Sequence, residues 1–151
     1  MKPLWNHRSY AGLALAATFL SGCGGVYDAT VTGLVTLDGQ AVPRGTVSYS
    51  PQGGGPSAYG QIDAQGKYTL RTGREEGLPV GQYTVTVAAN EPSNQTHGKN
   101  GGPPPVGKSI TPDWYRNPAN SGLSVSVKSG VQEIPLQLKS TPPPGWKPPR
   151  R

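Results

Sequence analysis

The most regular stretch of this 151-residue chain is Gln82-Tyr83-Thr84-Val85-Thr86-Val87-Ala88, and it sets the fold class. Its Tyr and Val side chains alternate with Thr side chains, so an extended backbone places the two kinds on opposite faces. An amphipathic helix repeats its apolar residues every three to four positions instead. The stretch therefore predicts a half-buried β-strand over residues 82–88, with its Tyr and Val side chains in the core.

Further segments show the same two-residue period, and turn signals separate several of them. Asp38-Gly39 is a strong tight-turn pair, and Asp63-Ala64-Gln65-Gly66 also indicates a turn. The chain is therefore predicted to be all-β, a single Greek-key, immunoglobulin-like sandwich of about seven short strands. The other strands are predicted at Thr30–Leu37, Gly45–Ser50, Ala58–Asp63, Lys67–Thr72, Leu123–Val127 and Val131–Leu138.

Two residues predict local details of this sandwich. Pro135 interrupts the last predicted strand and has no N–H to donate, so that strand is expected at a sheet edge or with a bulge. Tyr83 follows Gly81 at the start of its strand, which is typical of a tyrosine corner. In that arrangement the Tyr hydroxyl donates a hydrogen bond to the backbone a few residues upstream.

Glycine and proline are abundant, with 22 Gly and 17 Pro. Many of them gather in residues 51–56, 92–107 and 142–149, which are predicted to be flexible loops and an extended tail rather than a sign of general disorder. The single Cys excludes an intramolecular disulfide and a Cys-rich metal site.

The N-terminus reads as a targeting signal with a lipid attachment site. Lys2 and Arg8 precede a short apolar segment at residues 11–20, which suits a signal-peptide helix and is too short to span a bilayer. Leu20-Ser21-Gly22-Cys23 follows, and it resembles the bacterial lipobox. That resemblance implies a diacylglyceryl group on the Cys23 thiol, cleavage before Cys23, and an acyl group such as palmitate on the freed amine. The alternative is an ordinary secretory signal with a Cys by chance.

These features predict four segments and an extracytoplasmic location. The segments are a lipoprotein signal peptide at 1–22, a lipidated tether at 23–30, the sandwich at 31–139 and a Pro-rich basic tail at 140–151. The protein is expected to face the periplasm or the cell surface of a bacterial envelope. Gly24 and Gly25 stand where an Asp would signal retention at the inner membrane, which favours the outer membrane.

The formal net charge of +6 does not indicate a basic binding face. Much of it lies at the two ends of the chain, on Lys2, Arg8, Lys147, Arg150 and Arg151. A nucleic-acid partner requires basic residues clustered within the fold, so none is expected.

Several segments resemble, in order, the carboxypeptidase regulatory-like domains, which are transthyretin-like sandwiches. Val31–Gly39 resembles their first strand and turn, and Pro112–Pro118 resembles a segment that precedes the last strand pair in small bacterial lipoproteins with this domain. The resemblance implies a transthyretin-like fold, an extracytoplasmic setting and an accessory or binding role, with no common activity. The segments between are Gly45–Tyr49, Gly60–Leu70 and Leu78–Val87.

Motifs that would carry catalysis or nucleotide binding are weak. Gly102–Ser109 matches the P-loop pattern, but its three prolines supply no N–H groups to a phosphate, so no nucleotide is expected. His97 has no evident partner to orient it, and Glu75 and Glu76 are adjacent, so they point apart in an extended chain. No enzyme activity, cofactor or metal site is predicted.

Trp114-Tyr115, followed by Arg116, is the best candidate for contact with a ligand or partner. Exposed aromatic rings stack on sugars or anchor protein partners. The other interpretation is that a ring closes the open end of the sandwich. The sequence therefore predicts a lipid-anchored, non-enzymatic envelope module that binds or supports a protein, with a carbohydrate-binding lipoprotein using Trp114 and Tyr115 as the alternative.

Overall fold

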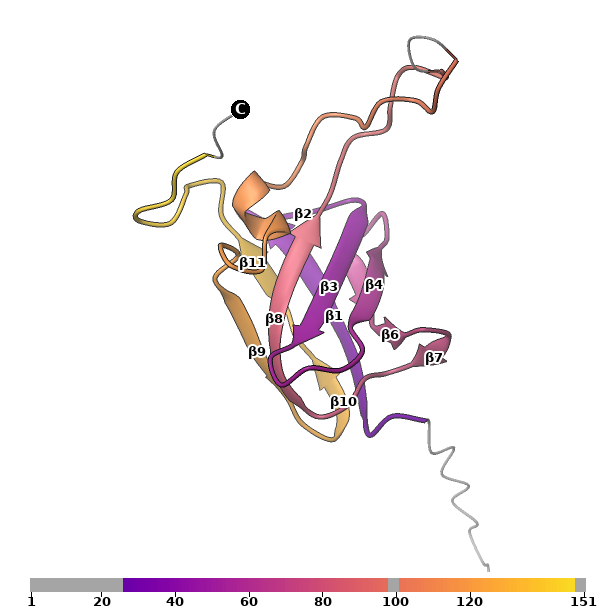
Figure 1. The fold of residues 1–151 in the computed structure, drawn as a ribbon, viewed down its shortest axis with the longest axis vertical. Coiled ribbons are helices and arrows are strands. Elements are labelled where there is room, and N and C mark those ends of the chain that lie inside the picture. Colours follow the sequence, from indigo (N-terminus) through magenta and orange to yellow (C-terminus); the bar gives the residue numbers. More distant parts are fainter. Residues whose placement is uncertain (1–25, 98–100, 149–151) are drawn as a thin grey trace, which may run out of the picture.

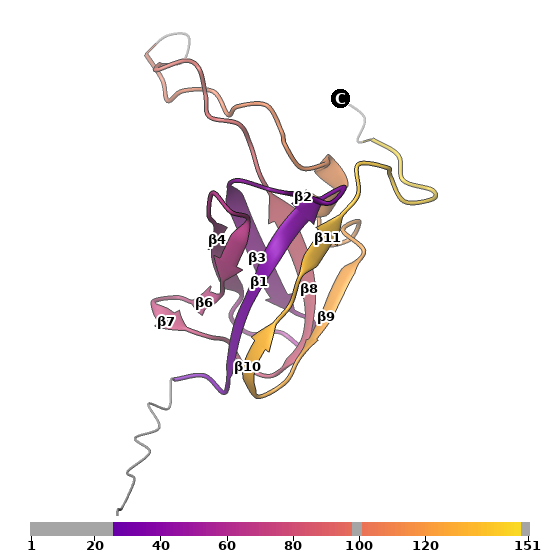
Figure 2. The ribbon, with the colours of Figure 1, turned by 180° about the vertical axis from the view of Figure 1, so that it is seen from behind.

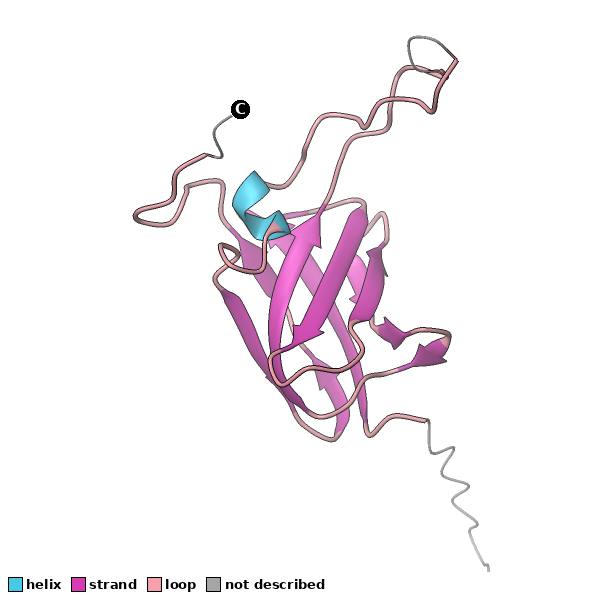
Figure 3. Ribbon diagram, in the orientation of Figure 1, coloured by secondary structure: helices cyan, strands magenta, loops and turns pink. Residues whose placement is uncertain are grey.

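The computed structural model describes residues 26–97 and 101–148, and within them the chain is almost entirely β-structure (Figures 1 and 3). Eleven strands form two sheets that face each other as a sandwich, and one short 3₁₀ helix accompanies them in this described part. The predicted all-β fold is confirmed. None of the helical structure described is long and apolar enough to cross a membrane. The predicted signal helix and Cys23 lie outside the described residues.

Each of the seven predicted strands is present, and two of them are divided. The six-stranded sheet has the order β7-β6-β4-β3-β8-β9, and in the smaller sheet β10, β11, β2 and β5 all pair with β1. The bounds are β1 (Ala29–Leu37), β2 (Gln40–Ala41), β3 (Gly45–Pro51), β4 (Ala58–Ile62), β5 (Lys67–Thr69), β6 (Arg71–Thr72), β7 (Glu75–Glu76), β8 (Gly81–Ala88), β9 (Leu123–Val127), β10 (Gly130–Glu133), β11 (Leu136–Leu138) and the 3₁₀ helix η1 (Asp113–Arg116).

The segment predicted as one strand over residues 67–72 passes from one sheet to the other at Leu70. β5 pairs with β1, whereas β6 pairs with β4 and β7. The Leu70 N–H donates to the carbonyl of Val31 at 2.9 Å, and the Leu70 carbonyl accepts from Gly77 N–H at 3.0 Å. Local periodicity cannot show this division, because the alternation of side chains continues unbroken through the change of partner.

The strand order is that of a Greek key. β3, β4 and the β5–β6 segment follow one another in the chain, and β8 then returns to lie beside β3. This is the spatial order of three consecutive strands with a fourth beside the first.

The first and last strands pair in parallel and tie the ends of the domain together. Ala29 to Thr32 pair with Gly130 to Glu133, and Val35 to Leu37 pair with Leu136 to Leu138. Pro135 lies in the gap between β10 and β11, at the edge of the smaller sheet. The edge position predicted from Pro135 is thus confirmed, and the strand is interrupted at the residue that cannot donate.

Three tyrosines make hydrogen bonds in the core, and the contact between Tyr49 and Tyr68 joins the two sheets. The Tyr49 and Tyr68 hydroxyls lie 3.0 Å apart, and the Tyr68 hydroxyl donates to the carbonyl of Ile134 at 2.6 Å. The Tyr83 hydroxyl donates to the carbonyl of Pro79 at 2.8 Å, which confirms the tyrosine corner. All three rings are buried, so each hydroxyl needs the partner that it has.

The two ends of the sandwich differ in what they carry (Figures 1 and 2). Residues 26–28 enter β1 at one end, and β1 begins at Ala29, two residues before the predicted start of the domain at 31. Ala29 is already buried, and its carbonyl accepts from Leu78 N–H at 2.9 Å. The long loop after β8, helix η1 and the C-terminal segment all lie at the opposite end, which we call the distal end.

Candidate functional site

Trp114 and Tyr115 close the distal end of the sandwich. They lie in η1, which begins after Pro112, and their exposed fractions are only 8% and 7%. The Tyr115 hydroxyl accepts from the Lys139 N–H at 3.0 Å, which fixes its ring above the end of β11. The interpretation of these rings as exposed contacts is corrected, because their surface is used to cover the core.

Trp146 covers Trp114 from outside. The ring centroids are 4.9 Å apart at an interplanar angle of 65°, an edge-to-face pair. A tight turn brings Trp146 into place, since its N–H donates to the Pro143 carbonyl at 3.1 Å and Gly145 takes φ +83°. This pattern is that of a type II turn, with Pro144 and Gly145 at its centre.

The sequence predicts an extended tail here and does not predict the contact between Trp146 and Trp114. A signal was present, because Pro144-Gly145 is a turn dipeptide and Trp146 is the one large apolar residue nearby. The sequence did not indicate which surface the ring would meet.

Arg116 holds the base of the long loop. Its guanidinium donates to the Ala89 carbonyl at 3.3 Å, to the Ser109 hydroxyl at 2.6 Å and to the Asn90 side-chain oxygen. Its Nε lies 3.7 Å from the Asp113 carboxylate. These three bonds all come from Nη2, so Arg116 positions the two sides of the loop through one nitrogen.

Beyond this base the loop projects from the distal end as an arm, which we define as residues 91–97 and 101–108 (Figures 1 and 2). Glu91 N–H donates to the Lys108 carbonyl at 2.7 Å, and Ile110 N–H donates to the Ala89 carbonyl at 2.9 Å. Pro103-Pro104-Pro105 and Val106 are exposed on the arm, Val106 to 77%. His97 is also exposed there.

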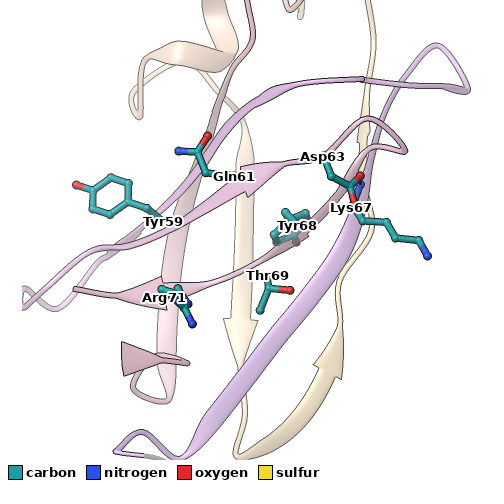
Figure 4. Close-up of a pocket in the computed structure, with 7 residues that line it drawn as sticks. All are labelled: Tyr59, Gln61, Asp63, Lys67, Tyr68, Thr69 and Arg71. Atoms are coloured by element: carbon teal, nitrogen blue, oxygen red, sulfur yellow. Dashed lines mark hydrogen bonds between the residues drawn. The ribbon is translucent and has the colours of Figure 1, made fainter. Parts of the chain in front are cut away.

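A separate hollow of about 310 Å³ lies against β4, β5 and β6 on the side of the sandwich (Figure 4). Tyr59 and Gln61 project from β4, Thr69 and Arg71 project from the neighbouring segment, and the edge of the Tyr68 ring lies between them. Tyr59 is 54% exposed, the most exposed aromatic ring of the core-bearing strands. The sequence analysis did not single out this hollow, because its residues come from strands that only the tertiary structure brings together.

The β4–β5 turn shapes one end of the hollow. The Asp63 carboxylate accepts from the backbone N–H groups of Gln65 and Lys67 at 2.9 and 2.8 Å. Asp63 therefore serves as the turn residue that the sequence predicted. Among the described residues, no group of three or more His, Cys, Asp or Glu side chains is placed to hold a metal ion.

The groups whose pKa is raised are three buried tyrosines, of which Tyr68 also lines this hollow. Burial raises the pKa of Tyr49 to about 12, and burial together with the neighbouring Tyr49 raises the pKa of Tyr68. Burial also raises the pKa of Tyr83. These phenols stay protonated at neutral pH and act as hydrogen-bond donors within the fold.

Cys23 lies outside the described residues, so its predicted lipidation stays a prediction. No protein-family model, no curated protein and no solved structure matches this chain, and the resemblance to carboxypeptidase regulatory-like domains likewise stays a prediction.

Proposed function

We propose that this protein is a lipid-anchored, non-enzymatic module of a bacterial cell envelope that presents its distal end to a protein partner. The observation that carries the proposal is that the two ends of the sandwich carry different segments. The chain enters β1 at one end, and the arm and the C-terminal segment project from the other (Figures 1 and 2).

The sequence supports the anchor at the entry end. Leu20-Ser21-Gly22-Cys23 provides the lipobox pattern, and only residues 24–28 separate Cys23 from the first residue of β1. Acyl chains on both the thiol and the amine of Cys23 would give stable anchoring, where a single chain is marginal. A short tether directs the entry end toward the membrane and the distal end away from it.

The distal end carries two exposed proline triplets that suit a protein partner. They are Pro103-Pro104-Pro105 on the arm and Pro142-Pro143-Pro144 in the C-terminal segment. Consecutive prolines favour the polyproline II conformation, which docks into aromatic-lined grooves. Arg116 holds the base of the arm and the Trp114–Trp146 pair holds the C-terminal segment, so less conformational entropy is lost on binding.

Sugar stacking on Trp114 and Tyr115 is the weaker alternative, because little of either ring is exposed. Stacking needs an open ring face, and both rings are used to cover the core, with Trp146 packed on Trp114.

Site-specific photo-crosslinking in cells tests the proposed partner surface. A benzophenone amino acid replaces Val106 on the arm in one strain and Val131 on β10 in the other, which are exposed to 77% and 83%. We expect position 106 to yield one crosslinked protein, identified by mass spectrometry, and position 131 to yield none. Adducts of equal yield at both positions, or no adduct at 106, would contradict the proposed distal-end partner.

The anchor is tested separately by Cys23→Ala. We expect this variant to leave the membrane fraction or to remain unprocessed. If Cys23→Ala is instead processed and retained in the membrane like the wild type, the lipid anchor is refuted.

A further inference from the structure

The outer face of β3, β8 and β9 has an unusual composition. These three neighbouring strands contain no Lys, Arg, Asp or Glu, whereas 15% of the whole chain is charged. The side chains that alternate with the core residues are hydroxyl and amide groups instead. They are Thr46, Ser48, Ser50, Gln82, Thr84, Thr86, Ser124 and Ser126.

The strand register joins this uncharged face to the hollow beside Tyr59. Ser48 lies opposite both Thr86 on β8 and Tyr59 on β4, and Tyr59 lies opposite Arg71 on β6. Directly opposite residues in antiparallel strands share a face. One row of side chains therefore runs from the hydroxyl-rich strands across Tyr59 to Arg71.

Tyr59 is the aromatic residue of this row and its ring is open to solvent. It is 54% exposed, and its neighbour toward β3 is the small Ser48, which leaves the ring uncovered on that side. Figure 4 shows the ring at the rim of the hollow of about 310 Å³, with Gln61 beside it on the same strand. A second hollow, of about 360 Å³, continues on the other side of β5 and shares Lys67 and Thr69.

Hydrogen-bonding groups line the same hollow as Tyr59. Gln61 offers an amide, Thr69 a hydroxyl and Arg71 a guanidinium. Arg71 also lies opposite Glu76 on β7, and the one ion pair within residues 26–97 and 101–148 joins Arg116 to Asp113. The combination is an exposed ring, amide, hydroxyl and guanidinium groups, and two hollows that share Lys67, Tyr68 and Thr69.

We infer that the face around Tyr59 binds a neutral polysaccharide chain. The Tyr59 ring stacks on a sugar ring, and Gln61, Thr69 and Arg71 hydrogen-bond with its hydroxyl groups. This chemistry fits a ligand that carries many hydroxyls, since β3, β8 and β9 beside the hollow present hydroxyl and amide groups and the charges in the hollow itself are of both signs, Lys67 and Arg71 with Asp63. The inference does not depend on the partner proposed for the distal end.

Other classes of macromolecule fit this face less well. The buried centre of a protein interface is rich in aromatic residues, Met and Arg and poor in Ser, whereas Ser and Thr dominate here. A nucleic acid would need a cluster of cations for its phosphates, and the hollow offers Lys67 and Arg71 together with the carboxylate of Asp63.

Native affinity electrophoresis of the full chain, purified in detergent, tests the inference. The gels contain laminarin, dextran, mannan or galactomannan, and polygalacturonate serves as an acidic comparison. We expect at least one neutral polysaccharide to retard the wild type, Tyr59→Ala to weaken that binding about tenfold or more, and Tyr59→Phe to keep it within about twofold, because Phe preserves the stacking ring. Val131→Ala, at a more exposed position on the smaller sheet, should bind as the wild type does.

Three outcomes overturn the inference. They are no retardation in any neutral gel, equal retardation of Tyr59→Ala and the wild type, or retardation by polygalacturonate alone that Arg71→Ala abolishes and Tyr59→Ala does not. Thermal unfolding of each variant checks that it is folded. Crosslinking from Val106 in the Tyr59→Ala strain keeps this result separate from the distal-end partner, because that adduct should persist.

Discussion

Tyr68 joins the two sheets through both its ring and its hydroxyl. Its ring lies close to two glycines, since a Cβ at Gly33 would stand 2.8 Å from the ring and one at Gly60 would stand 3.2 Å from it. Its hydroxyl donates to the Ile134 carbonyl and meets the Tyr49 hydroxyl. The glycines at these two positions therefore serve close packing rather than a turn.

Tyr68→Phe should lower the free energy of unfolding by about 1–3 kcal/mol, because it leaves the part-buried Ile134 carbonyl and the buried Tyr49 hydroxyl short of a partner. Urea unfolding followed by circular dichroism measures the change. Tyr59→Phe removes a hydroxyl from an exposed ring and should stay within about 0.5 kcal/mol of the wild type. Equal losses in the two variants would contradict the role given to the Tyr68 hydroxyl.

Gly33→Ala should destabilise the protein by about 1–3 kcal/mol, because the added methyl group is forced against the Tyr68 ring and the backbone of Ile134. Gly53→Ala is the matched control, since nothing lies within 4 Å of the Cβ that it would add. That variant should be neutral or slightly stabilising. The two thermal midpoints are compared, and a Gly33→Ala variant as stable as Gly53→Ala would show that Tyr68 and the Ile134 backbone can shift at no cost.

Stability should fall as the pH rises above about 10. The pKa of Tyr49 is about 12 in the folded protein and near 10 when unfolded, so the unfolded chain loses this proton first. The Tyr49 contribution is fully present below pH 10 and is lost as the pH rises toward 12, by about 2–3 kcal/mol. Urea unfolding at pH 9 and pH 11.5 should show a smaller fall for Tyr49→Phe than for the wild type. Identical pH profiles would refute this assignment.

At the scale of elements, η1 and the arm depend on each other. Arg116 at the end of η1 donates to Ala89 and Ser109, on the two sides of the base of the arm. The loop residues have few buried contacts of their own, so this cluster of hydrogen bonds sets the direction of the arm.

Arg116→Ala should loosen the base of the arm without unfolding the sandwich. Hydrogen exchange should become at least about tenfold faster at the amides of Glu91 and Ile110, whose hydrogen bonds close the base. The amides of β3 and β8 should exchange as they do in the wild type. Arg74→Ala, in an exposed turn, is the control. Unchanged exchange at both loop amides would show that Arg116 does not hold the arm.

At the scale of the whole molecule, the C-terminal segment completes the distal end. Trp146 packs edge-to-face on Trp114, which itself covers the core, so residues distant in the chain form one layered cap. The entry of β1 lies at the other end, and the hollow beside Tyr59 lies on the side (Figures 1 and 4). The proposed anchor, protein partner and polysaccharide would therefore meet three separate regions of the molecule.

Trp146→Ala should expose Trp114. The three Trp residues are Trp5, Trp114 and Trp146, so a Trp146→Ala chain cleaved before Cys23 carries Trp114 alone and its fluorescence reports that ring directly. We expect a red-shifted emission, stronger quenching by acrylamide and a loss of about 1–2 kcal/mol of stability. Lys147→Ala should leave stability unchanged. An emission maximum typical of a buried Trp in Trp146→Ala would mean that the segment does not cover Trp114.

The sequence alone determined the strands, the edge at Pro135, the turn at Asp63 and the corner at Tyr83, because each depends on two-residue alternation or on turn chemistry within a few residues. Only the tertiary structure decided that Leu70 changes sheets, that Trp146 buries Trp114, and that Ser48, Tyr59 and Arg71 form one row. These features are contacts between distant segments. A local pattern shows which face of a strand is buried, and it does not show which strand lies beside it.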